Sequence, residues 1–441
     1  MSTSPQGIPQ GTRNLGLIVF ASTLGTTIEW YDFFLYGVLT PIVLNHVFFP
    51  SLSPALGTIA AYTTFAVGFI SRPIGGIIFG HFGDRIGRKT ILVLTLMIMG
   101  GATFLIGLLP GAASIGVAAP LLLLFLRILQ GIGIGGEWGG AVLMAIEHAP
   151  PAQRSFFGSW PQLGVPLGLM SSAGVVGLLN YLPNSAFMLW GWRVAFMLSA
   201  VLVIIGIFVR LRIMETPDFL RVQATDKIVA VPVVEMIRTA PRSVLLTLGA
   251  RYVEGACFNV FGVFIIAYVV NSLHLTRGFA LLAVVLSSAF MLPFILIAGR
   301  LADRYGMRRV FATGALLIAV SSVASFALMQ AYGQTNHWVV LVAIIVPFSL
   351  FYPLVYGTES SLFASQFDAK IRYTGVSFAY QVSGIYASGL TPLIASALLA
   401  YDHGAPWYVV IYMIVVGLIS FASVMAMRFK APTSLEAVEY R

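Results

Sequence analysis

The chain has 441 residues, of which 58% are hydrophobic and only 9% are charged, and its formal net charge is +9. Soluble domains carry about 25% charged residues. A fold with so few charges could not cover its own surface in water, so the composition excludes an ordinary soluble protein and indicates a membrane protein. The single cysteine, Cys257, excludes an intrachain disulfide.

The apolar residues form blocks of about 20, the length at which a helix crosses the hydrocarbon core of a bilayer. The polar segment 1–14 comes first and does not resemble a cleavable signal peptide. In chain order we predict transmembrane helices at 15–37, 57–80, 90–110, 118–146, 156–180, 190–211, 244–271, 278–299, 308–330, 336–361, 372–400 and 405–428. The basic segment 212–243 is predicted to be a cytosolic linker, and 429–441 a C-terminal tail. The sequence therefore predicts an all-α membrane protein with twelve transmembrane helices.

The positions of Lys and Arg predict the orientation of these helices. With a cytosolic N-terminus, most of the 25 Lys and Arg fall in segments on the cytosolic side, including Arg85, Arg88 and Lys89 after the second helix and Arg210 at the end of the sixth. The positive-inside rule describes this bias. We therefore expect a multi-pass protein of the cell membrane with both termini in the cytoplasm. The basic charge is explained by topology, and nucleic-acid binding is not expected.

A sequence repeat relates the first six helices to the last six. The segment GHFGDRIGRK at 80–89 recurs as GRLADRYGMRR at 299–309, and Asp84 and Asp303 lie 219 positions apart (303 minus 84). Two further pairs repeat this offset to within one residue: Arg154 with Arg372, and Gln162 with Gln381. The repeat predicts two pseudo-symmetric six-helix halves, 15–211 and 244–428, with a site between them near the membrane midplane.

The repeated loop has a physical logic. Its glycines allow tight turns, and its Asp can sit at a helix N-terminus, where the backbone dipole favours an anion. We predict that it belongs to a cytosolic gate that stabilises one access state; the alternative is a loop that only anchors the topology. The predicted gate residues are Asp84, Arg85, Arg88, Glu147, Arg154, Asp303 and Arg304.

Several motifs resemble those of a known family. The loop GHFGDRIGRK resembles the signature between the second and third helices of the major facilitator superfamily, and RILQGIG at 127–133 resembles its fourth-helix pattern RxxQGxG. The segment EWYDFFLYG at 29–37 resembles the first helix of the metabolite:proton symporter family, as do RPIGG at 72–76, GGEWGG at 135–140 and WGWR at 190–193. The resemblance covers nearly the whole chain. It implies a monomeric importer of a small organic acid, such as shikimate or a dicarboxylate, that uses the proton gradient and no cofactor.

Alternatives remain open at this point. Members of the family also carry zwitterions such as proline and betaine, and the same fold can export a solute by proton antiport. A sensor or a membrane enzyme fits less well, because no signalling domain and no nucleophile–base set is visible. We expect no metal site, since the six His have no ligand spacing. The glycines between 131 and 140 lie in an apolar helix without a preceding strand, so they predict close helix packing rather than a nucleotide loop.

Ionisable residues inside the predicted helices are candidates for function, because an unpaired charge in hydrocarbon is costly. One face of the first helix is polar and is expected to line a water-filled cavity: Ser22, Gly25, Thr26, Glu29, Asp32 and Tyr36. The offset of 219 relates Asp32 to Arg251, and we expect these two residues to face each other across that cavity.

Two sets of site residues follow. The proton-coupling set is predicted to be Asp32, Glu29, Arg127 and Glu137. Arg251 is predicted to hold a substrate carboxylate, since its planar fork is always charged. The substrate-binding set is Arg251, Glu254, Tyr352, Tyr356, Gln162, Gln381 and Glu359. For each residue the alternative is a structural ion pair or plain packing.

Overall fold

The structure is a computed structural model that describes residues 15–52, 54–179, 181–211 and 232–428. Within these ranges the secondary structure is helical, without a strand. Ten described helical runs are long and apolar enough to cross a membrane. Helices α1 (Leu15–Leu39) and α3 (Pro54–Ile86), with 25 and 33 residues, complete the predicted twelve. The predicted fold class is confirmed.

The first bundle begins with α1 and contains the next five spans. Its remaining elements are η2 (Thr40–Leu44), α2 (Asn45–Phe48), α3, α4 (Arg88–Leu108), α5 (Ala112–Ile115), α6 (Ala118–His148), η3 (Pro151–Gln153), α7 (Arg154–Ser159), η4 (Pro161–Leu163), α8 (Gly164–Leu179), α9 (Asn184–Ala186), η5 (Phe187–Gly191) and α10 (Trp192–Leu211).

The second bundle follows a short helix, α12 (Pro232–Thr239), which lies in the predicted linker. Its elements are α13 (Pro241–Ala250), α14 (Tyr252–Asn259), η6 (Val260–Phe264), α15 (Ile265–Asn271), α16 (Arg277–Tyr305), α17 (Met307–Tyr332), α18 (His337–Ile345), η7 (Val346–Phe351), α19 (Tyr352–Ala364), α20 (Arg372–Ser383), η8 (Gly384–Gly389), α21 (Thr391–Tyr401) and α22 (Trp407–Ala426). The rest of the linker, 212–231, and the predicted tails 1–14 and 429–441 lie outside the described residues.

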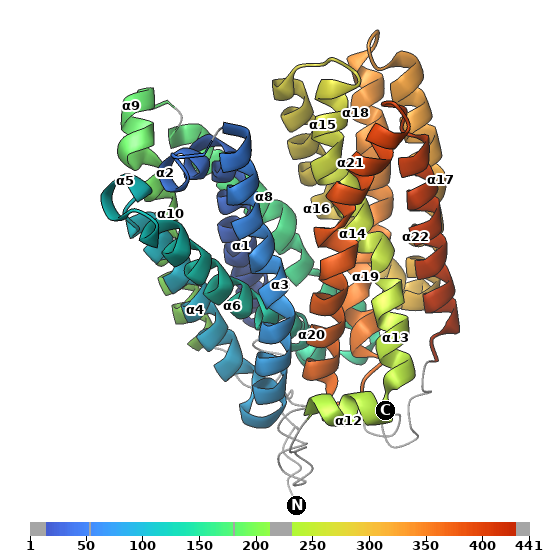
Figure 1. Cartoon of the computed structure of the whole chain (residues 1–441). Coiled ribbons are helices and arrows are strands. Elements are labelled where there is room, and N and C mark those ends of the chain that lie inside the picture. Colours follow the sequence, from blue (N-terminus) through green and yellow to red (C-terminus); the bar gives the residue numbers. More distant parts are fainter. Residues whose placement is uncertain (1–14, 53, 180, 212–231, 429–441) are drawn as a thin grey trace, which may run out of the picture.

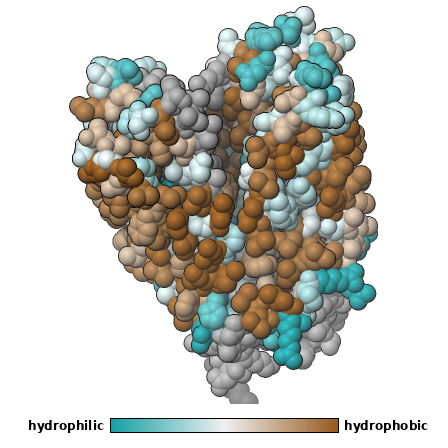
Figure 2. Space-filling model, viewed as in Figure 1, coloured by the Kyte–Doolittle hydropathy of each residue, from teal (hydrophilic) through white to brown (hydrophobic). Residues whose placement is uncertain are grey.

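The two bundles meet at one end and spread apart at the other. Figure 1 shows them together near α12 and separated toward the end that carries α2, α5 and α9. We call the end with α12 the basic end, because the junctions α3–α4 and α16–α17 there carry Arg85, Lys89, Arg304 and Arg308. Figure 2 shows the corresponding notch in the surface, and hydrophobic residues cover much of the visible flanks of both bundles. An apolar flank of this kind suits contact with lipid.

Glycines bring α3 and α6 into close contact. A Cβ added at Gly75 would lie 2.0 Å from the carbonyl oxygen of Ile132, and one at Gly135 would lie 2.1 Å from that of Arg72. Any larger residue would push the two helices apart, since both obstacles are backbone atoms. The close packing predicted for the glycine-rich segment is confirmed.

Three helices of the second bundle are interrupted by π-helical turns. These are η6 between α14 and α15, η7 between α18 and α19, and η8 between α20 and α21. Pro347, near the start of η7, has no N–H to donate to the regular helical ladder. Wide turns of this kind occur frequently at functional sites. Two of them border the charged cluster described below: η7 ends directly before Tyr352, and a Cβ added at Gly384 of η8 would lie 3.8 Å from Arg251 Nη1.

Candidate functional site

At the basic end, Asp84 of the first bundle binds the start of α20 in the second. Its carboxylate accepts hydrogen bonds from the backbone N–H of Thr374 at 2.9 Å and of Tyr373 at 3.3 Å, and from the Thr374 hydroxyl at 2.8 Å. The first backbone N–H groups of a helix lack partners within the helix, and the helix dipole favours an anion there. The contact joins the two bundles.

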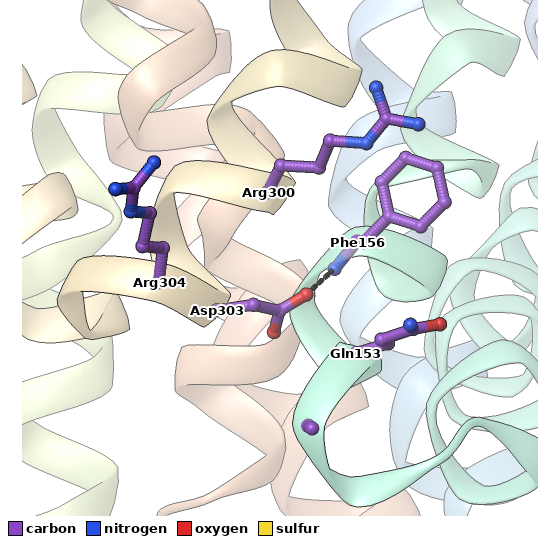
Figure 3. Close-up of a pocket in the computed structure, with 6 residues that line it drawn as sticks. Gln153, Phe156, Arg300, Asp303 and Arg304 are labelled. Atoms are coloured by element: carbon purple, nitrogen blue, oxygen red, sulfur yellow. Dashed lines mark hydrogen bonds between the residues drawn. The ribbon is translucent and has the colours of Figure 1, made fainter.

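The pseudo-symmetric contact is made by Asp303 of the second bundle at the start of α7. Its carboxylate accepts from the backbone N–H of Ser155 and of Phe156, both at 2.8 Å. Figure 3 shows this contact among residues that line a pocket of about 440 Å³; the Arg300 side chain extends over Phe156, and that of Arg304 extends in the opposite direction. The Arg300 guanidinium lies 4.5 Å from the centroid of the Phe156 ring. The helix N-terminus predicted for the loop Asp is thus observed twice, and Arg300 is a bridging residue that the sequence did not reveal.

A third bridge at the basic end is an ion pair. Arg372, the first residue of α20, places Nη1 2.9 Å from Oε1 of Glu147 near the end of α6. The Glu147 side chain is buried, whereas that of Arg372 is 18% exposed. Like the Asp84 contact, this pair joins an acid of the first bundle to the start of α20 in the second.

The other predicted gate residues make different contacts. Arg85 Nη1 lies 3.2 Å from Nε2 of His81 on its own helix. Arg304 lies beside the ring of its neighbouring tyrosine, and Arg154 is the first residue of α7. The side chain of Arg88 lies outside the described part of the structure. The acids of the predicted gate are therefore the members that join the bundles in the contacts described.

Within the second bundle, one cation and two acids form a buried cluster. Arg251 Nη2 lies 3.2 Å from Oε2 of Glu254, and its Nε lies 3.4 Å from Oε1 of Glu359 on α19. The Tyr352 hydroxyl donates to Oε1 of Glu254 at 2.8 Å. All three charged residues are at most 4% exposed. Four residues of the predicted substrate set thus lie together, and we call them, Arg251, Glu254, Tyr352 and Glu359, the charged cluster.

Aromatic rings enclose the charged cluster. The Arg251 guanidinium lies 3.7 Å from the centroid of Tyr380 on α20, within the range of a cation–π contact. Tyr356 stacks on Tyr352 with centroids 5.2 Å apart, and its buried hydroxyl makes no hydrogen bond within the described residues. Tyr380 was not among the predicted residues. The low dielectric that such rings create strengthens electrostatic interactions inside the cluster.

The repeated glutamines link this cluster to the first bundle. Trp138 of α6 donates through Nε1 to Oε1 of Gln162 at 2.8 Å, and Gln162 Nε2 donates to the Tyr356 carbonyl oxygen at 2.9 Å. In return, Gln381 Nε2 donates to the Gly135 carbonyl oxygen at 3.2 Å. Each glutamine therefore bonds the backbone of the other bundle, on the fourth and tenth spans that the repeat relates.

In the first bundle, Asp32 belongs to a buried hydrogen-bond network. Its Oδ2 accepts from the hydroxyls of Thr103 and Ser199, both at 2.9 Å. Gln130 Nε2 donates to Thr103 Oγ1 at 2.7 Å, and Arg127 donates to Gln130 Oε1. Arg127 is thereby connected to Asp32 through two neutral side chains rather than by a direct ion pair.

Two predictions about the first helix are wrong in this structure. The polar face does not line a water-filled cavity: Ser22, Thr26, Glu29, Asp32 and Tyr36 are all at most 3% exposed. Asp32 and Arg251 do not face each other across a cavity, because Asp32 bonds to α4 and α10 of its own bundle while Arg251 pairs with acids of α14 and α19. Asp32 is bonded to hydroxyl groups of neighbouring helices, where the prediction expected water and the opposite half.

Glu137 pairs with a residue that the prediction placed in the cytosolic loops. Arg210 donates to Glu137 and to the Leu92 carbonyl oxygen, and it is only 1% exposed. The Thr95 hydroxyl adds a bond to Glu137 at 2.9 Å. Glu29 is an electrostatic neighbour of this pair, and its Oε2 is buried without a hydrogen bond within the described residues. Arg210 is therefore buried in an ion pair and is not exposed among the loop cations.

A thin aromatic contact joins the bundles on the side of the notch. The ring of Phe258 on α14 lies 6.4 Å from that of Trp30 and 6.3 Å from that of Phe34, both on α1. It also lies 6.1 Å from Tyr352 of the charged cluster. These rings lie on the side of the cluster toward the open end, whereas hydrogen bonds and an ion pair join the bundles at the basic end.

Comparisons with known proteins agree with this architecture. The family model described as "Sugar (and other) transporter" matches residues 17–245, and the model "Major Facilitator Superfamily" matches 247–439. The shikimate transporter of Escherichia coli is 38% identical over 436 residues, which cover 97% of this chain and 98% of that protein. The inner membrane metabolite transport protein YhjE of the same organism is 40% identical, with 88% and 89% covered. The E. coli proline/betaine transporter is 32% identical, with 91% and 82% covered.

Solved structures show the same fold. The proton:xylose symporter XylE bound to 6-bromo-6-deoxy-D-glucose superposes with a TM-score of 0.74 at 19% identity, covering 94% of this chain and 95% of that one. The inward-open form of XylE from E. coli gives a TM-score of 0.62 at 17% identity, covering 96% and 99%. At this level of identity the likeness concerns the fold alone.

Proposed function

Since the chain belongs to the major facilitator superfamily, we propose that it imports a small carboxylate metabolite together with protons, with shikimate as the first candidate. The coarser statement needs no proposal: the chain is a multi-pass membrane transporter and not an enzyme. The finer one depends on the chemistry of the charged cluster and on the relative that carries the name shikimate transporter.

The observation that carries this proposal is a buried arginine with unused donors. Arg251 Nη1 is buried and makes no hydrogen bond within the described residues, and Nε has only the 3.4 Å ion-pair contact with Glu359. Buried donors without hydrogen-bond partners cost free energy. A substrate that binds in one step of the transport cycle would supply the missing partners. A guanidinium with free N–H groups suits a carboxylate, which accepts two parallel hydrogen bonds.

In this proposal the substrate reaches Arg251 from the notch and leaves at the basic end. The polar contacts of Asp84, Asp303 and Glu147 hold the basic end closed, and the aromatic contact of Phe258 is the thinner barrier on the other side. Substrate and proton then bias one equilibrium between two arrangements of the bundles. The gate role predicted for the loop acids fits this scheme.

Proton coupling is assigned to the first bundle, as the sequence led us to expect. Asp32 is 0% exposed, and one of its oxygens, Oδ1, makes no hydrogen bond within the described residues. Glu29 and Glu137 lie nearby on α1 and α6 beside buried arginines. Ionisable groups at membrane depth typically serve proton or substrate movement.

We further propose that the basic end faces the cytoplasm of a cell membrane, that both termini lie on that side, and that the monomer is the working unit. The concentration of Arg and Lys at this end supports the orientation through the positive-inside rule. Each monomer contains both bundles and therefore the whole interface between them. Reporter fusions at the two termini would test the orientation.

Transport by purified protein in liposomes tests the function. With an inward proton gradient, wild-type protein should accumulate labelled shikimate, and collapse of the gradient by a protonophore should abolish accumulation. Asp32→Asn should lose accumulation yet keep exchange of external for internal shikimate. Equal accumulation by Asp32→Asn at several pH values would remove Asp32 from the proton role. Failure of wild type to take up shikimate or a dicarboxylate would contradict the proposal itself, and gradient-driven efflux would favour export.

A zwitterion is a second candidate, because the charged cluster holds two acids and one cation. Glu254 or Glu359 could face a quaternary ammonium while Arg251 holds the carboxylate of the same molecule. A proline/betaine transporter is among the relatives. Thermal stabilisation of the purified protein by betaine and proline, but not by shikimate, would select this alternative.

A further inference from the structure

The charged cluster carries one more acid than it has cations. Arg251, Glu254 and Glu359 are at most 4% exposed, so their formal charges sum to one negative charge in a water-poor site. Uncompensated charge in such a site is costly, and one of the acids must be the easier one to neutralise. The contacts of the two acids identify which.

Glu254 and Glu359 are held differently. Glu254 accepts a hydrogen bond from Tyr352 at 2.8 Å, and it also forms an ion pair with Arg251 at 3.2 Å. Glu359 lies 3.4 Å from Arg251 Nε, and neither of its oxygens makes a hydrogen bond within the described residues. An incoming carboxylate therefore breaks the fewest interactions if it replaces Glu359, rather than Glu254, at Arg251.

Within the described residues, no second cation is an electrostatic neighbour of Glu359; Arg72 of α3 is a neighbour of Arg251 and Tyr380 instead. The charged neighbours of Glu359 among the described residues are Arg251 and Glu254, both contributed by the seventh span. Tyr356 on its own helix and Tyr380 on α20 also face it. The titratable side chains of α7, α16 and α17, which pack against α19, lie at the ends of those helices. On α6, which also packs against α19, Arg127 bonds to Gln130, Glu137 pairs with Arg210 and Glu147 pairs with Arg372. A displaced Glu359 carboxylate would therefore be left beside Glu254 and the substrate, all of them negative.

We propose that Glu359 takes up a proton when a substrate carboxylate replaces it at Arg251. One proton from water becomes bonded to a Glu359 oxygen, the substrate carboxylate forms the ion pair with Arg251, and the cluster keeps its single negative charge. When the substrate leaves, the proton is released and Glu359 returns to Arg251. This inference rests on the proposed carboxylate transport and extends it: proton and substrate bind at one arginine, separately from any proton carried by Asp32.

Asp32 offers the contrast that makes the proposal testable. Its carboxylate is held by Thr103 and Ser199 inside the first bundle. A substrate carboxylate that binds Arg251 breaks none of these Asp32 contacts. Charge balance in the charged cluster therefore requires no proton at Asp32. Assigning the proton to Glu359 therefore predicts proton uptake when the substrate binds, whereas a proton carried by Asp32 does not require it.

The experiment measures proton uptake when shikimate binds to purified, detergent-solubilised protein, by calorimetry in buffers of different ionisation enthalpy. Wild type should take up about one proton per shikimate bound, and affinity should fall with rising pH by up to about tenfold per unit. Glu359→Gln should bind shikimate without linked proton uptake and with an affinity independent of pH. Asp32→Asn should retain the wild-type linkage.

The outcomes separate the inference from the proposed function. Proton uptake by Glu359→Gln equal to that of wild type overturns the inference while leaving carboxylate transport intact, and so does binding to wild type without proton uptake. Absence of carboxylate binding to wild type overturns the proposed function instead. Glu359→Asp, which keeps the carboxyl group, should restore the linkage; a thermal unfolding scan verifies that each variant is folded, and loss of linkage in a folded Glu359→Asp would also count against the assignment.

Discussion

The indole of Trp138 lies flat on the ring of Tyr380, with ring centroids 3.6 Å apart and planes inclined by 13°. The Arg251 guanidinium lies 3.7 Å from the same tyrosine ring. Two groups this close to one ring must occupy its opposite faces. Trp138 belongs to the first bundle and the other two residues to the second, so a three-layer stack runs from the charged cluster across the interface.

The stack predicts that Trp138 helps to keep the bundles together around the cluster. Offset or parallel aromatic pairs contribute about 0.5–1.5 kcal/mol beyond burial. Trp138→Leu should therefore raise the population open at the basic end by about two- to tenfold. Spin labels at Phe82→Cys and Tyr305→Cys, in a Cys257→Ala background, would report the distance between the bundles. Trp138→Phe keeps a ring but loses the bond to Gln162, so it should lie between wild type and Trp138→Leu; an unchanged distance distribution in Trp138→Leu would contradict this role.

The two loop aspartates predict additive effects on the same equilibrium. Asp84→Asn and Asp303→Asn each weaken charge-assisted bonds to backbone N–H groups of the opposite bundle, for which about 1.5–3 kcal/mol is typical. Each variant should favour opening at the basic end, and the double variant should add the two free energies because the two contacts share no residue and stabilise one state.

The same spin-label pair measures these variants, and Asp402→Asn serves as the control. Asp402 follows α21 at the opposite end, so its change should leave the basic end closed. A double variant no more open than either single one would show that the aspartates anchor the loops without acting as a latch.

The sequence predicts the parts of this arrangement to which the repeat or helix polarity points. The repeat offset located Asp84 and Asp303, and the rule that anions suit helix N-termini identified the kind of partner they have. Gln162 and Gln381 were found through the same offset. These predictions succeeded because symmetry and helix polarity are properties of the chain itself.

Arg210 shows where such reasoning fails. It follows a long apolar run, and loop cations in that position are normally at the membrane surface, yet its partner Glu137 lies 73 residues away on another helix. The pairing of Asp32 with Thr103 and Ser199 is equally invisible in the sequence, because it requires the packing of α1 against α4 and α10. Tyr380 and Trp138 were missed since aromatic residues in spans are usually only packing.

The aromatic contact at the notch predicts an effect on access to the charged cluster. Phe258→Ala removes the ring that contacts Trp30 and Phe34, so the path from the notch to the charged cluster should open more often. A cysteine at Tyr356, in the Cys257→Ala background, should react with a membrane-impermeant thiol reagent about two- to tenfold faster, in line with the loss of one or two aromatic pairs. Phe290→Ala, at an exposed ring of α16, is the matched control and should leave the rate unchanged. An unchanged rate in Phe258→Ala would show that these rings do not limit access.

The buried pair Glu137–Arg210 predicts an asymmetric loss of stability. Breaking a buried ion pair by removing one partner typically costs about 3–5 kcal/mol, because the other charge stays buried. Arg210→Met should be the more damaging change, since Glu137 and its neighbour Glu29 would then face each other without that cation. Glu137→Gln leaves Arg210 close to Glu29, which offsets part of the loss.

A double-mutant cycle by thermal unfolding in detergent tests this argument. Glu137→Gln combined with Arg210→Met should unfold at a higher temperature than Arg210→Met alone, because the second change removes the stranded acid. Glu235→Gln is the matched control: Glu235 lies 3.5 Å from Lys370, both side chains are at least 27% exposed, and such pairs contribute only about 0–1 kcal/mol. If the double variant unfolded at a lower temperature than both single ones, Glu137 and Arg210 would be stabilising the first bundle independently, and the ion pair would not be the source of its stability.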